Sequence, residues 1–275
     1  AEVLVQNVKS EIPVCIVRPP IVGPAYTEPF PGWVDNLNGF VAYIERMSIG
    51  IIRCIYVTSK GTIDVVPVDH VVNLTLVAAM RLGSGSGKIN DIAVYNSTNN
   101  ENPYVCNDSM IQGFQDNPRN QIVWYPSVVY VRNHAIFAIV NFFVHFIPAI
   151  LADGFLIISG TKPKMMKIYR KIRTLTNATM ELQRSDHWLS TENTKLLYNT
   201  LDPIDKESFN FDIQSIDYSD YMRVTNYGIR YFACNEEDKD LPKARKNFKR
   251  FRIYYITSWG LFILVALSII GLLLS

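Results

Sequence analysis

The residues whose types best suit chemistry lie in a proline-rich loop that begins at Arg18. The loop follows a short apolar run at residues 14–17, which predicts a parallel strand covered on both faces. Arg18, Pro19 and Pro20 should end this strand. Proline has no backbone N–H and a fixed φ, so we expect the chain to leave the sheet there in an extended loop. Ligands of open α/β sheets bind just beyond the carboxyl ends of the strands, so the loop should line a ligand site.

The loop and the motifs that follow it resemble one family. Residues 18–36 read RPPIVGPAYTEPFPGWVDN, and the first part is similar to the sixth strand of extended short-chain dehydrogenases. The whole stretch resembles the alcohol-forming fatty acyl-CoA reductases, the male sterility protein family. Further markers of that family follow in order: WYP at 124–126, HFIP at 145–148, GTKPK at 160–164, Trp188, FNFD at 209–212, YGIR at 227–230 and LPKAR at 241–245. Residues 180–190 depart from the family pattern, but the resemblance covers nearly the whole chain.

The resemblance implies a reaction and a set of site residues. The reaction is the NADPH-dependent reduction of long-chain fatty acyl-CoA to a primary alcohol, through two hydride transfers and an aldehyde. The residues expected to border the nicotinamide are Pro19, Pro20, Ile21 and Val22. Those expected to border the reacting acyl group are Gly23, Trp33 and Asn36.

The fold class that the sequence predicts is α/β. Residues 1–120 read as the second half of a Rossmann-type, extended short-chain dehydrogenase domain, and residues 121–245 as the helical "sterile" domain of the family. Residues 37–47, 70–82, 108–114, 165–175 and 191–201 are expected to be helical, and residues 51–56 and 92–96 to be strands. Residues 1–8 read as the middle of an amphipathic helix without an N-cap. We therefore expect the sequence to lack its N-terminal part, including the Gly-rich dinucleotide turn, which follows no strand here. In the resembling family the catalytic Tyr-x-x-x-Lys pair lies on the helix that ends at residues 1–8, so the resemblance implies that this pair lies upstream of Ala1, and no catalytic residue is assigned here.

Several other features exclude function classes. The Gly-rich run at residues 83–87 follows a helical pattern and precedes a strand, the reverse of a dinucleotide turn, so we interpret it as a loop. The four cysteines, Cys15, Cys54, Cys106 and Cys234, are widely spaced, which favours a reducing compartment and argues against a zinc site. The formal net charge of +2 gives no reason to expect a nucleic-acid partner.

Four polar residues in the sequence admit both a structural and a functional interpretation. Asp69 is expected to cap the helix at 70–82, and His70 to begin that helix rather than act as a base. His145 and Asp153 interrupt a long apolar stretch at residues 135–158, together with Asn141 and Pro148. Because proline kinks helices and acidic groups are costly in lipid, we favour helices that pack on the body or dip into a membrane surface over a membrane span.

The C-terminal segment has the pattern of a membrane anchor. Residues 243–252 carry six cations and no acid, and residues 253–274 are uncharged and mostly apolar. As a helix, residues 253–274 would be roughly 33 Å long, which matches a hydrocarbon core of about 30 Å. The positive-inside rule places the body in the cytosol. We expect membrane lipid as a partner and the endoplasmic reticulum or the peroxisome as the compartment. The sequons at Asn73, Asn96, Asn107 and Asn177 should then be unused.

Two alternatives remain open at this point. One is another membrane-anchored extended dehydrogenase, acting on a sterol or a nucleotide sugar. The other is a non-catalytic lipid-binding or scaffold protein, if the chain is a product in itself. The ordered C-terminal motifs favour the reductase over the first alternative.

Overall fold

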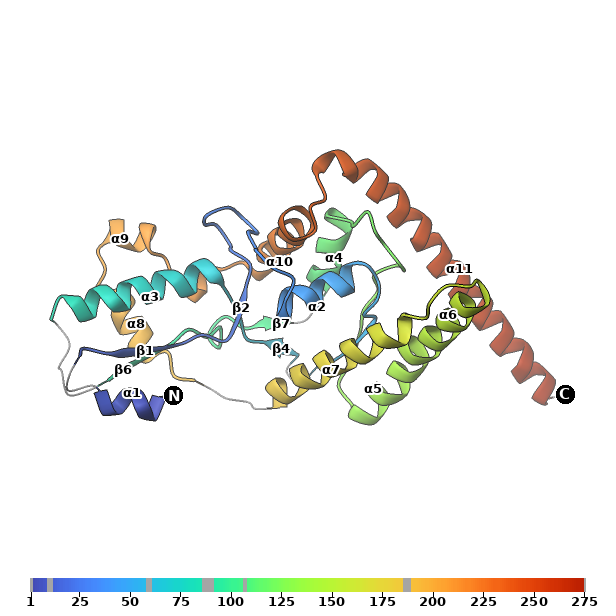
Figure 1. The fold of residues 1–275 in the computed structure, drawn as a ribbon, viewed down its shortest axis with the longest axis horizontal. Coiled ribbons are helices and arrows are strands. Elements are labelled where there is room, and N and C mark those ends of the chain that lie inside the picture. Colours follow the sequence, from blue (N-terminus) through green and yellow to red (C-terminus); the bar gives the residue numbers. More distant parts are fainter. Residues whose placement is uncertain are drawn as a thin grey trace.

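The computed structural model describes residues 2–8, 12–57, 61–85, 92–105, 108–184 and 189–274. Cys106, Asn107, Trp188 and residues 86–87 of the Gly-rich run lie outside the described residues. Figure 1 shows an elongated chain in which β1, β6 and α3 lie toward one end and the long helix α11 projects from the other.

Two short parallel strand pairs position the proline-rich loop. Strand β1 (Cys15–Arg18) pairs with β6 (Ala93–Asn96), and β2 (Ile21–Gly23) pairs with β5 (Val65–Pro67). Strand β1 ends at Arg18 as predicted, but residues 21–23 are not in a loop, because they form β2 in a second sheet. Pro19 and Pro20, which have no N–H to donate, fall in the gap where the chain changes its pairing partner. Backbone pairing begins again at Ile21, now on the side of strand β5, where the Ile21 N–H donates to the Asp64 carbonyl at 3.2 Å.

The remaining strands confirm the α/β class. Strand β3 (Cys54–Tyr56) runs parallel to β8 (Val129–Val131), while β4 (Thr62–Ile63) and β7 (Tyr104–Val105) form a short antiparallel pair. Three of these four strand pairs are parallel, and successive parallel strands require crossover connections that usually contain helices.

Helices lie close to the positions that the sequence predicts. The described helices of the first half are α1 (Glu2–Val8), α2 (Gly39–Ser48), α3 (Val68–Gly83) and α4 (Asp108–Asp116). Those after residue 160 are α7 (Met165–Arg184), α8 (Glu192–Asn199), α9 (Pro203–Ser208) and α10 (Tyr218–Gly228). A π segment, η3 (Ile229–Ala233), continues α10, and two short 3₁₀ turns are η2 (Ile213–Ser215) and η4 (Asp238–Asp240).

One hydrophobic core joins the two halves of the chain. The buried side chains of α2, such as Ile44 and Met47, belong to the same cluster as Tyr221 and Met222 of α10. A buried ion network adds to this contact, because Arg119 lies 3.4 Å from Glu45 of α2 and 3.1 Å from Glu236. The first half, residues 1–120, is called the reductase-like half below, and residues 121–245 the helical half. The two halves bury apolar surface against each other.

The long apolar stretch forms one continuous helix. It runs from α5 (His134–Asn141) through a π segment, η1 (Phe142–Phe146), into α6 (Ile147–Ile158), and is called the apolar helix below. The sequence pattern predicts interruptions here; the structure instead absorbs Pro148 by a π segment just before it, a known way to accommodate a freed carbonyl. Within the described residues, only this helix is long and apolar enough to cross a membrane, and just 11 % of its most apolar window is buried.

The C-terminal helix is longer than the predicted anchor. Helix α11 (Leu241–Leu274) contains both the basic run and the apolar tail in one element. The large apolar side chains of the tail, among them Trp259, Phe262 and Leu264, are exposed. Helix α7 likewise extends the predicted basic helix of residues 165–175 as far as Arg184.

Candidate functional site

The proline-rich loop, residues 19–36, is closed by its own backbone. The Ala25 N–H donates to the Trp33 carbonyl at 3.0 Å, and the Gly32 N–H donates back to the Ala25 carbonyl at 2.8 Å. Gly32 has a backbone φ of +79°, a conformation that residues other than glycine rarely adopt. The loop is therefore a defined structure that can hold a binding surface in place.

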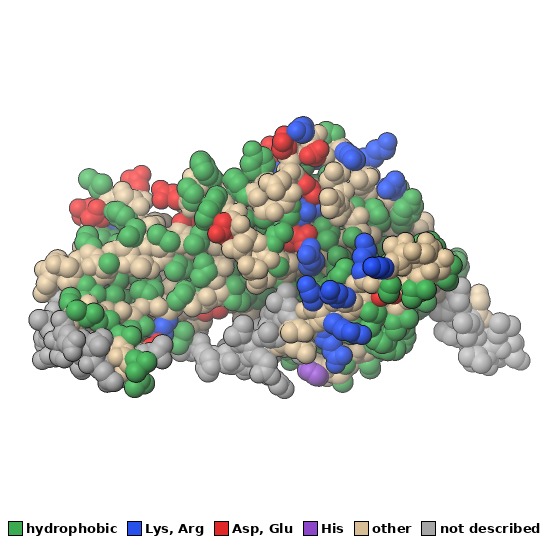
Figure 2. Space-filling view, in the orientation of Figure 1, with side chains coloured by type: hydrophobic (Ala, Val, Ile, Leu, Met, Phe, Trp, Pro, Cys, Tyr) green, Lys and Arg blue, Asp and Glu red, His purple; other side chains and the backbone are tan. Residues whose placement is uncertain are grey.

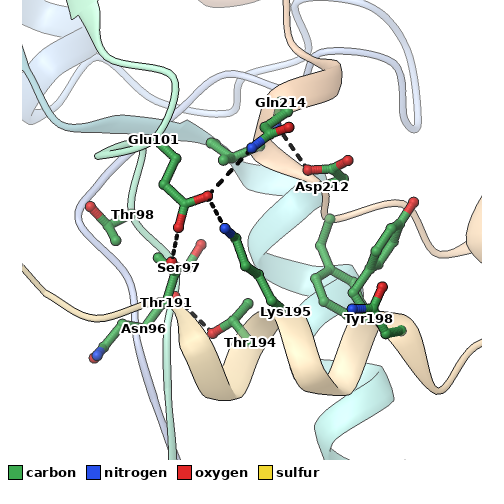
Figure 3. Close-up of a pocket in the computed structure, with 13 residues that line it drawn as sticks. Asn96, Ser97, Thr98, Glu101, Thr191, Thr194, Lys195, Tyr198, Asp212 and Gln214 are labelled. Carbon is green, nitrogen blue, oxygen red and sulfur yellow. Dashed lines mark hydrogen bonds and ion pairs between the residues drawn. The ribbon is translucent and has the colours of Figure 1, made fainter.

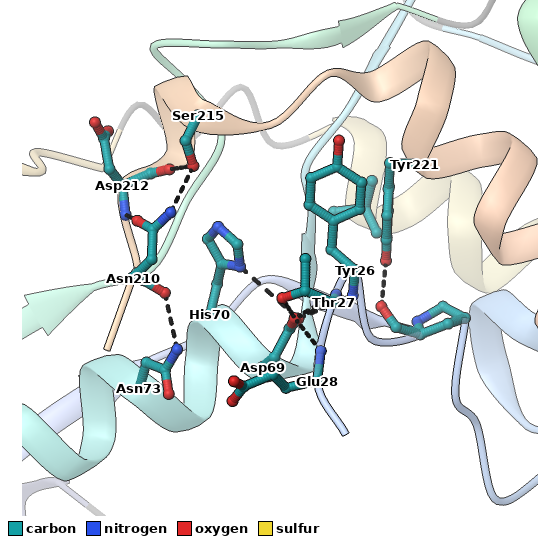
Figure 4. A network of polar contacts seen from close by, with 12 residues as sticks. Tyr26, Thr27, Glu28, Asp69, His70, Asn73, Asn210, Asp212, Ser215 and Tyr221 are labelled. Atoms are coloured by element: carbon teal, nitrogen blue, oxygen red, sulfur yellow. Dashed lines mark hydrogen bonds and ion pairs between the residues drawn. The ribbon is translucent and has the colours of Figure 1, made fainter. Parts of the chain in front are cut away.

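Asp69 anchors this loop to helix α3 (Figure 4). Its carboxylate accepts hydrogen bonds from the backbone N–H groups of Tyr26 (3.1 Å), Thr27 (2.8 Å) and Glu28 (3.2 Å), and from the Thr27 hydroxyl (3.1 Å). The prediction that Asp69 caps its own helix is wrong. Pro67 holds the N-cap position of α3, and Asp69 lies inside the first turn, from which its side chain reaches the loop.

These contacts set the charge state of Asp69. Burial alone would raise the pKa of its carboxyl, but the His70 imidazole and the loop amides outweigh burial and hold the pKa well below its usual value. His70 is buried beside it, with Nδ1 3.8 Å from the nearer carboxylate oxygen. His70 lies in the first turn of α3 as predicted, and it lines a cavity of about 250 Å³ with Tyr26, Thr27 and Glu28 of the loop.

Helix α10 of the C-terminal half holds the other side of the loop. The hydroxyl of the fully buried Tyr221 donates to the Pro24 carbonyl at 2.9 Å. The ring of Tyr26 packs edge-on against Tyr221, with centroids 5.8 Å apart. A Cβ atom on Gly23 would lie 2.1 Å from the Tyr221 hydroxyl, so only glycine allows this approach.

A direct backbone contact between two glycines completes the attachment. A Cβ atom on Gly228 of α10 would lie 1.7 Å from the carbonyl oxygen of Gly32, and one on Gly32 would lie 2.4 Å from the Val224 carbonyl oxygen. The loop therefore rests on the helix backbone itself. With Asp69 on one side and α10 on the other, both halves of the chain fix the position of the loop.

The residues predicted to border ligands lie along this loop with different exposures. Val22 of β2 is apolar yet 39 % exposed, and Pro19 is also exposed, so the segment just beyond β1 offers an apolar surface. Pro20 and Ile21 are half-buried beside them.

The three residues predicted to border the acyl group differ more widely in their exposure to solvent. Trp33 is half-buried and Asn36 is exposed, with its side-chain amide donating to Asp35 at 2.6 Å. Gly23 is buried beneath Tyr221 and can face a ligand only through its backbone. The structure thus places all seven predicted residues on one strand-to-helix segment that leads into α2.

A second polar cavity lies at the carboxyl end of β6 (Figure 3). Its volume is about 290 Å³, at the lower limit of ligand pockets, and Asn96, Ser97 and Thr98 form one wall. The Lys195 ammonium forms a direct ion pair with the Glu101 carboxylate in the cavity wall. Hydrogen bonding from Lys195 and Thr191 lowers the pKa of Glu101 and keeps it ionised. Because the ammonium is already neutralised, the cavity is poorly suited to a phosphate.

The residues that hold the loop were missed by the sequence analysis. Tyr221 and Gly228 lie about 200 positions away from the loop, and no local pattern links them to it. Asp69 was noticed, but a helix-capping partner is the local expectation for an aspartate at that position. Only the three-dimensional contact shows that its partners are the amides of residues 26–28.

Comparison with known proteins gives two matches to family models described as male sterility protein. One, an NAD-binding domain that implies a nicotinamide cofactor, matches residues 1–75, which include the proline-rich loop and Asp69. The other matches residues 144–236, which include α10. The two matches therefore fall on the two halves that hold the loop between them.

Similar proteins extend this result over almost the whole chain. The chain is 36 % identical to "Fatty acyl-CoA reductase 1" of Gallus gallus over 276 residues, which is 96 % of the chain and 53 % of that protein. It is 35 % identical to the Homo sapiens protein of the same name, with the same coverage. It is 32 % identical to "Fatty acyl-CoA reductase wat" of Drosophila melanogaster, over 97 % of the chain and 52 % of that protein. The chain thus spans about half the length of the curated relatives it matches.

Proposed function

Since this chain belongs to the male sterility protein family, we propose that it acts in the NADPH-dependent reduction of long-chain fatty acyl-CoA to fatty alcohol. The observation that carries the proposal is the proline-rich loop, which is held between the two parts of the chain that match the family. The relatives named fatty acyl-CoA reductase support it, and they speak against a sterol or nucleotide-sugar dehydrogenase.

In this proposal the loop provides two neighbouring surfaces. Pro19, Pro20, Ile21 and Val22 border the nicotinamide, which supplies the hydride when the cofactor is bound. Trp33, Asn36 and the backbone of Gly23 border the acyl group that receives the hydride. The exposed apolar face of Val22 and the half-buried ring of Trp33 support these assignments.

The contribution of the chain to the reaction is then orientation. Hydride transfer requires the two reacting carbons to be held close together and aligned, and small displacements reduce the rate strongly. Asp69 and Tyr221 fix the loop from opposite sides by hydrogen bonds to its backbone, at 2.8 Å to the Thr27 N–H and 2.9 Å to the Pro24 carbonyl. Such anchors hold both ligand surfaces in one geometry.

We further propose that the C-terminal part of α11, residues 253–274, anchors the protein in a membrane with its body in the cytosol. The exposed apolar side chains of this segment and the preceding cations support the assignment. This arrangement brings the site near soluble NADPH and acyl-CoA, while the alcohol product can enter the lipid. The endoplasmic reticulum and the peroxisome are the compartments that we propose.

The test is a chimera that joins the N-terminal half of the Gallus gallus relative to residues 1–275. We expect it to oxidise NADPH in the presence of palmitoyl-CoA and to form hexadecanol, while residues 1–275 alone should show no turnover. The matched control is the same chimera carrying Gly228→Ala, which displaces the loop. Folded chimera without acyl-CoA-dependent NADPH oxidation would contradict the proposal.

A further inference from the structure

The polar side chains that interrupt the apolar helix all bond toward the protein body. His145 Nε2 accepts the backbone N–H of Arg53 at 2.9 Å, so the ring is neutral and its Nδ1–H donates to Asn141 Oδ1 at 2.7 Å. The Asp153 carboxylate accepts three backbone N–H groups at the start of α7, from residues 164–166, at 2.7–2.9 Å. These groups need no water on the opposite side of the helix.

The π segment explains how polar groups so far apart share one side. A π segment holds more residues per turn than an α-helix, so it rotates the residues after it relative to those before it. Asn141, which lies before η1, donates to the Tyr169 hydroxyl of α7 at 3.4 Å, and Asp153, which lies after η1, accepts from the first residues of α7. The outward face is left to apolar side chains.

That outward face is large and exposed. Its apolar side chains are between 45 % and 87 % exposed, and they are Ile136, Ile139, Phe142, Phe143, Ile150, Leu151, Phe155, Ile157 and Ile158. Soluble monomers rarely expose so large a continuous apolar patch, and a patch bordered by polar residues marks an interaction site.

The border of this patch is strongly basic. Residues 162–173 carry six exposed cations, and the sequence has no acidic residue between Asp153 and Glu181. The cations are Lys162, Lys164, Lys167, Arg170, Lys171 and Arg173. Figure 2 shows Lys and Arg side chains gathered over α7, next to the hydrophobic surface of α5 and α6. An apolar face bordered by cations is complementary to the surface of an anionic bilayer.

We propose that the apolar helix and α7 dock on an anionic phospholipid bilayer, with the apolar helix lying in the plane of the interface. The helix does not cross the bilayer, because its inward side is bonded to the backbone of Arg53, just before β3, and packed on α7. Crossing would carry the cations of α7 into hydrocarbon, where Lys and Arg are costly. The proposal deepens the membrane attachment proposed above, and it does not depend on reductase activity.

The test is photo-crosslinking in proteoliposomes, with the full chain held on the vesicle by α11. Benzoylphenylalanine replaces Phe155, which is 69 % exposed on the patch, or Phe30, which is 61 % exposed on the proline-rich loop and serves as the control. We expect lipid adducts at Phe155 and none at Phe30, with a higher yield in vesicles that contain phosphatidylglycerol than in pure phosphatidylcholine. Equal yields at the two positions would mean that the patch faces water, and would overturn the proposal.

Two further measurements test the lipid charge and the orientation. Each cation near an anionic surface contributes about fivefold to the equilibrium constant for docking. The variant Lys167→Gln/Arg170→Gln/Lys171→Gln should therefore lower that constant on phosphatidylglycerol vesicles about 100-fold, which the yield of lipid adducts at Phe155 reports. The variant Lys206→Gln/Arg223→Gln/Lys239→Gln, whose cations lie on other elements, should have no effect. If both triple variants crosslink like the unmodified chain, anionic recognition is wrong. Lys162, in the turn after α6, should react with a membrane-impermeant acylating reagent added on the side of the body; protection of Lys162 would show a span instead.

Discussion

The close packing of Gly228 against Gly32 predicts that Gly228→Ala is destabilising although it places alanine in a helix. Gly→Ala in a helix interior normally stabilises by about 1 kcal/mol. Here the added Cβ would lie 1.7 Å from the Gly32 carbonyl oxygen, so helix and loop must separate by roughly 1 Å or more. The loop cannot yield alone, because the Gly32 N–H is bonded to the Ala25 carbonyl at 2.8 Å. Overpacking of this kind costs about 1–3 kcal/mol or more.

The matched control is Gly154→Ala, because a Cβ atom there would meet nothing within 4 Å and Gly154 is also helical. Since 1 kcal/mol shifts Tm by about 2–4 °C in a chain of this size, Gly228→Ala should lower Tm by about 2–12 °C and Gly154→Ala should raise it slightly. Thermal unfolding of both variants measures this, and hydrogen exchange at residues 32–33 should accelerate only in Gly228→Ala. If the two variants melt alike, the contact between α10 and the loop does not exist as described.

Three further predictions concern the loop and the anchor. Asp69→Asn should accelerate hydrogen exchange of the amides of residues 26–28 about 30-fold at pH 7, since about 2 kcal/mol of charge-assisted bonding is lost, whereas Asp35→Asn in the same loop should not. Because folding lowers the pKa of Asp69, the advantage of the native carboxylate is complete above about pH 4 and should shrink as the pH falls further; an advantage that persists unchanged to pH 2 would contradict the assignment. In the chimera, Trp33→Ala should strongly reduce acyl-CoA turnover while changing Tm little, because the ring lines the substrate cleft. If turnover falls only in proportion to the fraction of folded protein, Trp33 is a core residue. Deleting residues 253–275 should release the protein into carbonate extracts, and glycosidase treatment of the intact protein should leave its mobility unchanged; a mobility shift would overturn the cytosolic topology.

The sequence predicts the elements well where a local pattern decides them. The helices at α2, α3, α4 and α8 and the strand at β6 lie within a few residues of their expected positions, because periodicity and the residues that end helices act over short distances. The order of the family motifs likewise identifies the family, which the comparisons confirm. Both kinds of signal are visible without knowing which segments meet.

The sequence fails where a residue has a partner distant in the chain. A proline pair predicts the end of a strand, yet Ile21 resumes pairing with a different strand, next to Asp64. Asp69 looks like a cap until the loop amides are seen beside it. Asn141, His145 and Asp153 would argue against contact with lipid only if their side chains faced the lipid. They bond toward the protein body instead, and no sequence pattern predicts the π segment that brings Asn141 and Asp153 to the same side.

The same reasoning bears on the division of the chain into domains. A boundary near residue 120 follows from the change in composition, but the proline-rich loop depends on residues from both sides of it. Asp69 holds the loop from the reductase-like half, while Tyr221 and Gly228 hold it from the helical half. Because the buried cluster also combines Ile44 with Met222, removing the helical half would expose the core of the first half and leave the loop attached on one side only. The helical half is therefore part of the structure that forms the candidate site.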